Sequence, residues 1–271
     1  MTTPVSALFI SGWSCPQVWL RPLADALAPS VDLRAVGLSA LLEEGRSQPM
    51  AGLSSYASGV ISLMRNQAGP VWLGGWSMGG MVALECAAAV PERVCGLILV
   101  GSTLRFCSDG PDSPGMERAA VRAMAMGLRR DVPATMERFY ALAAHPFKPG
   151  PVNTDCSADA LIHGLTYLQE TDLRALACRV ERPALVIHGD QDAVVPVGAG
   201  RQLALSLPGG RWLTYEGAGH DIPVRWPGRL AKDVGVFVRQ GLSDRPEYLA
   251  GDEDEILDRH RGQAGNRERG A

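Results

Sequence analysis

Short apolar segments that alternate with helical segments constrain this chain more than any other feature of its sequence. Residues 94–100, VCGLILV, contain no polar side chain, which is typical of a strand buried on both faces of a parallel sheet. Further strands are predicted at residues 5–10, 70–76 and 183–190, a second candidate at 31–36, and a strand followed by a loop at 211–220. Because segments with helical spacing, such as residues 53–67 and 78–90, separate them, we expect an α/β fold with a mostly parallel central sheet and helices on both faces.

The alternation stops between residues 103 and 176, where helical spacing continues and no strand is evident. An insertion at this point would lie above the carboxyl edge of the sheet, where α/β proteins bind ligands, so we interpret residues 103–176 as a helical lid. Residues 1–102 and 177–243 would then form the core. Residues 244–271 are charged and poor in apolar side chains, which predicts a disordered tail.

The composition excludes several classes of protein. The chain has 271 residues, 46% of them hydrophobic, and a formal net charge of −3, so it can bury a large core and has no overall positive charge for nucleic acid. No apolar run is long enough for a signal peptide or a membrane span, and we expect a cytoplasmic monomer. The six cysteines are scattered, which favours buried thiols over disulfides: Cys15, Cys86, Cys95, Cys107, Cys156 and Cys178.

The stretch GGWSMGG places a serine among glycines between a predicted strand and a predicted helix. Residues 75–79 fit G-x-S-x-G, the nucleophile elbow, in which a strained turn projects the serine hydroxyl above the sheet. Glycine at the flanking positions leaves room for the chain to pass closely. The alternative is a glycine-rich turn with an incidental serine, and two partners in the order serine, acid, histidine decide between them.

The acid is expected in the segment LVIHGDQDAVVP, at the end of a predicted strand. We favour Asp192, whose carboxylate can reach back across the sheet edge, and keep Asp190 as the alternative, since it suits a turn residue that bonds its own backbone. No acidic residue directly follows the strand at residues 94–100, the other end from which an acid could reach.

The base is expected at His220, on a glycine-rich loop after the last predicted strand. Four other histidines lack its order or position: His188 precedes the acid turn and is expected to stabilise it, His260 belongs to the tail, and His145 and His163 lie in the lid. A single loop histidine is usually a polar surface residue, but the elbow and the acid turn reverse that expectation for His220.

Together these residues predict acyl transfer by a serine nucleophile. His220 would take the proton of Ser77 as the hydroxyl attacks an acyl carbon, and Asp192 would orient the imidazole. The backbone N–H groups of Met78 and Trp13 would form the oxyanion hole. The Trp13 ring is either a wall of the acyl pocket or a core aromatic. No dinucleotide fingerprint, phosphate loop or metal-ligand spacing is present, so we expect no cofactor and no metal.

Residues 4–241 resemble the α/β-hydrolase superfamily, and within it the pimeloyl-[acyl-carrier protein] methyl ester esterases of biotin synthesis. The segments that carry the resemblance are GWSCPQVW, GWSMGGMVAL, VPERVCGLILVGS, MERFYALAA and LQETDLRALACRVERPALVIHGDQDAVVP. The resemblance implies the α/β-hydrolase fold, the triad Ser77, Asp192 and His220, and an oxyanion hole at Trp13 and Met78. It further implies hydrolysis of the pimeloyl methyl ester with release of methanol.

The resemblance also assigns roles to the lid. The acyl chain would be lined by Phe139, Tyr140, Ala141, Leu142 and Ala143, in addition to Trp13, Ser77, Met78 and His220. The acidic acyl-carrier protein would be held by Arg122, Arg129, Arg130 and Arg138, with Arg118 beside them. The alternative for these arginines is a solvated helix face, since Asp131 and Glu137 dilute their charge.

Two departures from the family pattern affect this interpretation. Ser11 stands where many relatives have histidine before the oxyanion tryptophan, and residues 34–50 replace a turn rich in proline and glycine.

A second hypothesis for the function is a general short-chain esterase, a lactonase or a carbon–carbon bond hydrolase with the same triad. A third is a non-catalytic binding protein, which the loss of a triad residue would favour. A dehalogenase is excluded, because it would need aspartate in place of Ser77.

Overall fold

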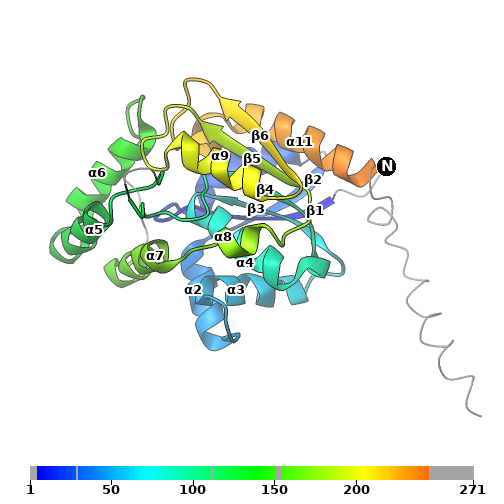
Figure 1. The fold of residues 1–271 in the computed structure, drawn as a ribbon, viewed down its shortest axis with the longest axis horizontal. Coiled ribbons are helices and arrows are strands. Elements are labelled where there is room, and N and C mark those ends of the chain that lie inside the picture. The colour runs from blue at the N-terminus through cyan, green and yellow to red at the C-terminus, as the bar shows by residue number, and fades with distance from the viewer. Residues whose placement is uncertain (1–4, 29, 111–112, 151–153, 155, 244–271) are drawn as a thin grey trace, which may run out of the picture.

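In the computed structural model, six parallel strands form one sheet at the centre of the molecule (Figure 1). The structure describes residues 5–28, 30–110, 113–150, 154 and 156–243, and the predicted tail at 244–271 lies outside them. The strand order is β2-β1-β3-β4-β5-β6, and each neighbouring pair is parallel. The bounds are β1 (Val5–Ile10), β2 (Val31–Val36), β3 (Val71–Trp76), β4 (Val94–Val100), β5 (Ala184–Gly189) and β6 (Gly210–Tyr215). All six lie where the sequence predicts a strand.

Helices cover both faces of this sheet, and each face has its own hydrophobic cluster. On one face lie α1 (Arg21–Leu27), α10 (Ile222–Arg225) and α11 (Pro227–Ser243). On the other lie α2 (Leu38–Ser47), α3 (Ser55–Arg65), α4 (Met78–Ala89), α8 (Arg174–Ala177) and α9 (Val197–Ser206), and two 3-10 turns occur at η1 (Gln17–Leu20) and η2 (Pro91–Arg93). The strands β3 and β4 are buried at every position, as their apolar sequences predict.

Helix α2 lies at residues 38–47, for which no helix is predicted from the sequence. Its signal is present in the chain, because Leu38, Leu41 and Leu42 are buried at helical spacing. Helix α2 crosses α3 at Gly45, where a Cβ atom would lie 1.7 Å from the carbonyl oxygen of Ser55. The segment that departs from the family pattern thus forms a helix packed tightly against its neighbour.

In the described part of the predicted lid, three helices extend between β4 and β5 ahead of α8: α5 (Arg118–Arg130), α6 (Val132–Ala144) and α7 (Ala158–Glu170). They extend to one side of the sheet (Figure 1). Asp131 separates α5 from α6, and its carboxylate accepts a hydrogen bond from the Ala134 N–H at 3.0 Å, which caps α6. Helix α5 packs against both α6 and α7, so the three helices form one unit.

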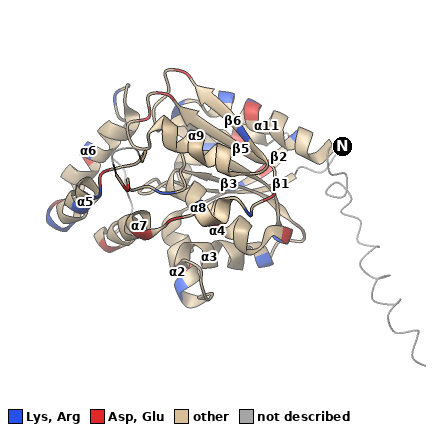
Figure 2. Ribbon diagram, in the orientation of Figure 1, with Lys and Arg blue, Asp and Glu red and all other residues tan. Residues whose placement is uncertain are grey.

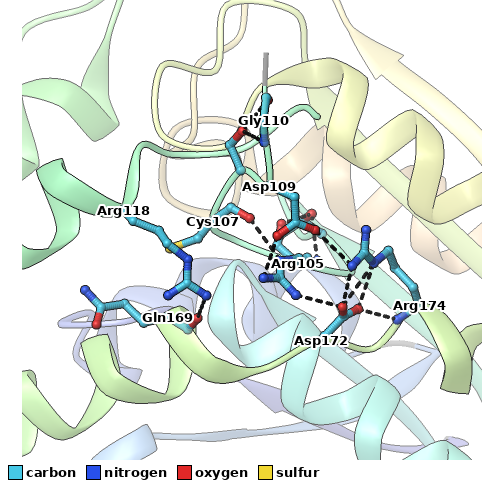
Figure 3. A network of polar contacts seen from close by, with 10 residues as sticks. Arg105, Cys107, Asp109, Gly110, Arg118, Gln169, Asp172 and Arg174 are labelled. Carbon is cyan, nitrogen blue, oxygen red and sulfur yellow. Dashed lines mark hydrogen bonds and ion pairs between the residues drawn. The ribbon is translucent and has the colours of Figure 1, made fainter. Parts of the chain in front are cut away.

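Charged residues join the two ends of the lid (Figure 3). Arg105, after β4, contacts Asp109 at 2.6 Å and Asp172 at 2.7 Å. Arg174, at the start of α8, contacts Asp172 at 2.5 Å and Asp109 at 2.9 Å. Hydrogen bonds from Arg174, outweighing partial burial, hold the pKa of Asp172 well below its usual range. Two cations and two carboxylates therefore hold together the points at which the lid leaves and rejoins the core.

Candidate active site

Ser77 occupies a strained turn between β3 and α4. Its φ of 56° lies in the left-handed region, which residues other than glycine rarely adopt. The Ser77 N–H donates to the Val100 carbonyl at 2.8 Å, and the Ser102 hydroxyl donates to the Ser77 carbonyl at 2.9 Å. A Cβ atom at Gly75 would lie 2.2 Å from the backbone of Gly79, so both glycines permit the sharp turn. This is the strand–turn–helix context that the elbow motif requires.

Asp192 and His220 form a buried hydrogen-bonded pair at the ends of β5 and β6. The Nδ1 atom of His220 lies 2.7 Å from Oδ2 of Asp192, while Oδ1 accepts the N–H groups of Val194 and Val195, both at 2.8 Å. Burial by itself would raise the pKa of Asp192, but attraction to His220 and hydrogen bonds from His188 and His220 outweigh it and hold the pKa well below its usual range. Asp192 therefore stays ionised and faces the imidazole.

The alternative acid, Asp190, lies elsewhere. Its side chain is on the exposed side of the turn, and Oδ1 accepts the Gly217 N–H at 2.7 Å, so it holds the loop after β6 rather than bonding its own backbone. His188 is fully buried, with Nε2 2.9 Å from the Val195 carbonyl and 3.2 Å from Oδ2 of Asp192. It thus contacts the acid turn, where the sequence analysis expects it.

The loop that carries His220 is fixed by contacts with the sheet. The indole N–H of Trp76, the residue before Ser77, donates to the His220 carbonyl at 2.8 Å. Gly101, at the end of β4, lies so close that a Cβ atom there would be 3.3 Å from Nδ1 of His220. The ends of three strands therefore surround the imidazole, which is only 2% exposed.

A cavity of about 340 Å³ is lined by both Ser77 and His220. Of the residues that the resemblance assigns to the acyl chain, Trp13, Phe139, Tyr140 and Ala143 also line it. Phe139 packs edge-on against Trp13, with ring centroids 4.8 Å apart. Burial raises the pKa of Tyr140 to about 12, and its hydroxyl donates to the Ser14 carbonyl at 2.8 Å. Lid helix α6 therefore supplies one wall of the cavity and is tied to the loop after β1.

Three of the predicted substrate-binding residues do not line this cavity. Leu142 lines a separate, smaller cavity, which also contacts Ser77. Ala141 is exposed and lines neither cavity, because successive residues of a helix are rotated by about 100° and cannot all face one cavity. The Met78 side chain is buried in the core and lines neither cavity, which leaves its backbone N–H as the group with a predicted role.

The Trp13 indole contacts the lid as well as the cavity. Its N–H donates to the Leu161 carbonyl of α7 at 2.9 Å, and the residue is 4% exposed. A Cβ atom at Gly164 would lie 2.5 Å from the Trp13 ring, so α7 approaches this tryptophan as closely as a glycine allows. Both sequence interpretations of Trp13, a pocket wall and a core aromatic, describe part of its environment.

Several cavity residues were not anticipated: Cys15, Trp19, Trp76, Ala144, Gly150, Asp221, Val224 and Arg225. Three of them are adjacent to predicted residues, since Trp76 precedes Ser77 within the elbow motif, Ala144 follows Ala143 and Asp221 follows His220. Their place in the sequence, next to predicted residues, could have indicated these three. Val224 and Arg225 belong to α10, and only the tertiary packing of that short helix brings them to the cavity.

The predicted carrier-binding arginines lie on the outer surface of the lid. Figure 2 shows basic residues on α5 in blue, and Arg122, Arg129, Arg130 and Arg138 are all exposed. Arg118 is exposed as well, and its guanidinium donates to the Gln169 carbonyl at 3.0 Å, which ties α5 to the end of α7.

Within the part of the chain that the structure describes, no three His, Cys, Asp or Glu side chains are grouped so that they could hold a metal ion. In the same residues, no helix combines the length and apolar character needed to cross a bilayer.

Comparison with known proteins decides the family. The sequence model of the Alpha/beta hydrolase family matches residues 7–233, which is most of the chain. The chain belongs to the Alpha/beta hydrolase family. The predicted fold is thereby confirmed, and so is the resemblance on which the sequence analysis relies.

The relatives of this hydrolase include named esterases. A pimeloyl-[acyl-carrier protein] methyl ester esterase of Xanthomonas axonopodis pv. citri is 32% identical over 225 residues, which are 79% of this chain and 87% of that protein. A protein of the same name from Chromobacterium violaceum is 36% identical over 160 residues, 56% of this chain and 63% of that protein, and so aligns over less than two thirds of its length.

Solved structures share the fold of this hydrolase at low sequence identity. A hydrolase from Oleispira antarctica has a TM-score of 0.78 and 15% identity, with 88% of this chain and 92% of that chain covered. An esterase from Exiguobacterium antarcticum has a TM-score of 0.74 and 19% identity, covering 88% and 93%. With the named relatives, these findings agree with the predicted class, a carboxylic ester hydrolase.

Proposed function

We propose that this hydrolase is a serine carboxylesterase in which Ser77 is the nucleophile, His220 the general base and Asp192 the residue that orients the imidazole. One observation carries the proposal. Ser77, in a left-handed turn, and His220, hydrogen-bonded to a buried carboxylate, line the same cavity. A nucleophile, a base and an orienting acid in this chain order support acyl transfer over mere ligand binding.

The first half of the reaction forms an acyl-enzyme. The Ser77 hydroxyl oxygen attacks the ester carbonyl carbon while Nε2 of His220 takes its proton, and the backbone N–H groups of Trp13 and Met78 stabilise the oxyanion. Collapse of the tetrahedral intermediate breaks the bond to the alkoxy oxygen. That oxygen takes the proton from His220 and leaves as the alcohol.

The second half releases the acid. A water molecule gives a proton to His220 as its oxygen attacks the acyl carbon, and the second tetrahedral intermediate expels the Ser77 oxygen, which recovers the proton from His220. Asp192 stays ionised throughout. Its depressed pKa supports this role, since an ionised carboxylate fixes the tautomer of the imidazole and stabilises its charged form.

For the substrate we propose the methyl ester of pimeloyl-[acyl-carrier protein], hydrolysed to pimeloyl-[acyl-carrier protein] and methanol in biotin synthesis in the cytoplasm. The names of the relatives support this choice. The apolar walls supplied by Trp13, Phe139 and Tyr140 suit a methylene chain. The exposed arginines of the lid, Arg122, Arg129, Arg130 and Arg138, would contact the acidic carrier, and the protein would act as a monomer.

The nucleophile is tested with Ser77→Ala. We expect hydrolysis of a p-nitrophenyl ester to be lost while the thermal transition stays nearly unchanged. Retained turnover would show that another group attacks the ester.

The substrate is tested by competition. Pimeloyl-[acyl-carrier protein] methyl ester and short p-nitrophenyl esters are supplied together at low and high salt, and kcat/KM is compared. We expect a preference for the carrier-bound ester that weakens as salt screens the arginines. If the small esters are preferred at every salt concentration, the enzyme is a general short-chain esterase with the same triad.

A further inference from the structure

We propose that the smaller cavity beside Ser77 receives the alkoxy group of the ester, and that its size restricts the leaving alcohol to methanol. This inference rests on the proposed function. Beyond that function, it assigns the acyl and alkoxy ends of the ester to the two cavities and names a side chain that sets the specificity for the alcohol.

Two cavities meet at the nucleophile. Trp13, Ser77 and Phe139 line both of them. The larger cavity continues to Val224, which is 41% exposed, and to Gly150, which is also exposed, so it opens to the surface. The smaller cavity has a volume of about 20 Å³, and apart from Ser77 its described lining is apolar and contains no exposed residue.

The carrier decides which end of the ester lies in which cavity. An acyl chain bound to a carrier protein must reach the surface, and the larger cavity is the one whose described lining includes exposed residues. The acyl chain therefore lies in the larger cavity, and the alkoxy group faces the smaller one. Only the alkyl carbon of the alkoxy group has to enter the smaller cavity. The alkoxy oxygen stays bonded to the carbonyl carbon that Ser77 attacks, within the reach of His220.

The volume of the smaller cavity limits what can enter. The smaller cavity has about 20 Å³ against about 340 Å³ for the larger one, so it favours a small alkoxy group such as methoxy. Each lid helix supplies a wall: Met124 from α5, Leu142 from α6 and Leu165 from α7, with Val194 of the core opposite. A methylene that does not fit such a site reduces kcat/KM by about tenfold or more.

Met124 is the side chain to change, because it is only partly buried and its truncation removes little of the core. Met124→Ala should enlarge the cavity. Met126→Ala is the matched control, since Met126 lies on the same helix, is 59% exposed and lines neither cavity. Equal thermal transitions of the two variants would show that the truncation has not disturbed the fold.

The experiment uses two series of esters with the full chain. The first series is the methyl, ethyl and propyl monoesters of pimelic acid, and the second is the methyl esters of fatty acids of increasing length. We expect kcat/KM of the unaltered protein to fall at least about tenfold from methyl to propyl, and to change little over the second series. Met124→Ala should raise the propyl-to-methyl ratio about tenfold, and Met126→Ala should leave it unchanged.

Opposite selectivity would overturn the proposal. If the rate is indifferent to the alcohol and falls steeply with acyl length, or if Met124→Ala extends the acyl range instead, the smaller cavity holds the acyl end. These outcomes leave the triad intact, because Ser77→Ala would still abolish turnover. Turnover retained by Ser77→Ala is a failure of the proposed function itself, and the two failures are thereby distinguished.

Discussion

The carboxyl edge of the sheet and the lid above it are fixed in different ways. At the sheet edge, Ser77, Asp192 and His220 are buried and held by backbone hydrogen bonds at the ends of β3, β5 and β6. The lid is held by charged contacts at its two ends and by helix packing, and its outer face is exposed. The proposed chemistry therefore lies in the part held by backbone hydrogen bonds, and the lid supplies walls of both cavities.

The sheet edge gives the largest expected effect. In Asp192→Asn the carboxylate that faces Nδ1 of His220 becomes an amide, which no longer fixes the imidazole tautomer, so kcat should fall about ten-thousandfold. Steady-state hydrolysis of a p-nitrophenyl ester measures it. Asp190→Asn is the control, since Asp190 lies in the same turn and bonds the Gly217 N–H instead, and we expect less than about a tenfold change in kcat. A comparable loss of kcat in both variants would mean that activity depends on the conformation of the turn and not on the Asp192 carboxylate itself.

The same contrast explains how much of the site could be predicted. Parallel strands bring their carboxyl ends to one edge, so three short motifs at strand ends were enough to predict that the serine and the histidine lie at one cavity, with the acid hydrogen-bonded to the histidine. The sequence favours Asp192 over Asp190 because its carboxylate can reach back across the sheet edge, and in the structure Asp192 faces His220 while Asp190 accepts the Gly217 N–H.

The lid could be predicted only in outline. Its helical character follows from spacing, but consecutive residues of a helix such as 139–143 cannot all face one cavity, and Ala141 lies on the exposed side. The contributions of Arg225 and Val224 depend on how α10 packs, which no local pattern encodes. For helix α2 the local pattern is sufficient, because its leucines have helical spacing. The comparison of this segment with a turn of the family obscures that pattern.

A substitution at the contact between the lid and the sheet edge, where Gly164 of α7 meets Trp13, should reduce activity by an intermediate amount. In Gly164→Ala the new methyl group would lie 2.5 Å from the Trp13 ring, so either α7 or the tryptophan must move. We expect kcat/KM to fall about tenfold, because the predicted oxyanion-hole residue is displaced, and stability to fall by about 1–3 kcal/mol.

Gly110→Ala is the matched control in the lid, since nothing lies within 4 Å of a Cβ atom at that position. Hydrolysis rates and denaturant unfolding of the two variants are compared. A Gly164→Ala protein of normal activity and reduced stability would show that the lid packs on Trp13 without positioning it for catalysis.

The outer face of the lid should give the smallest effect, and one that depends on the substrate. Arg129→Glu reverses a charge on the exposed surface of α5, at a residue with no proposed part in breaking the ester bond. With the carrier-bound ester at low salt, kcat/KM should fall about fivefold, because an exposed charge influences encounter more than chemistry. With a p-nitrophenyl ester it should not change. Arg21→Glu makes the same charge change on α1, against the opposite face of the sheet, and controls for net charge. Equal losses in the two variants would show that overall charge attracts the carrier. A loss confined to Arg129→Glu, and abolished by high salt, would show that this face of the lid meets the carrier while the sheet edge performs the reaction.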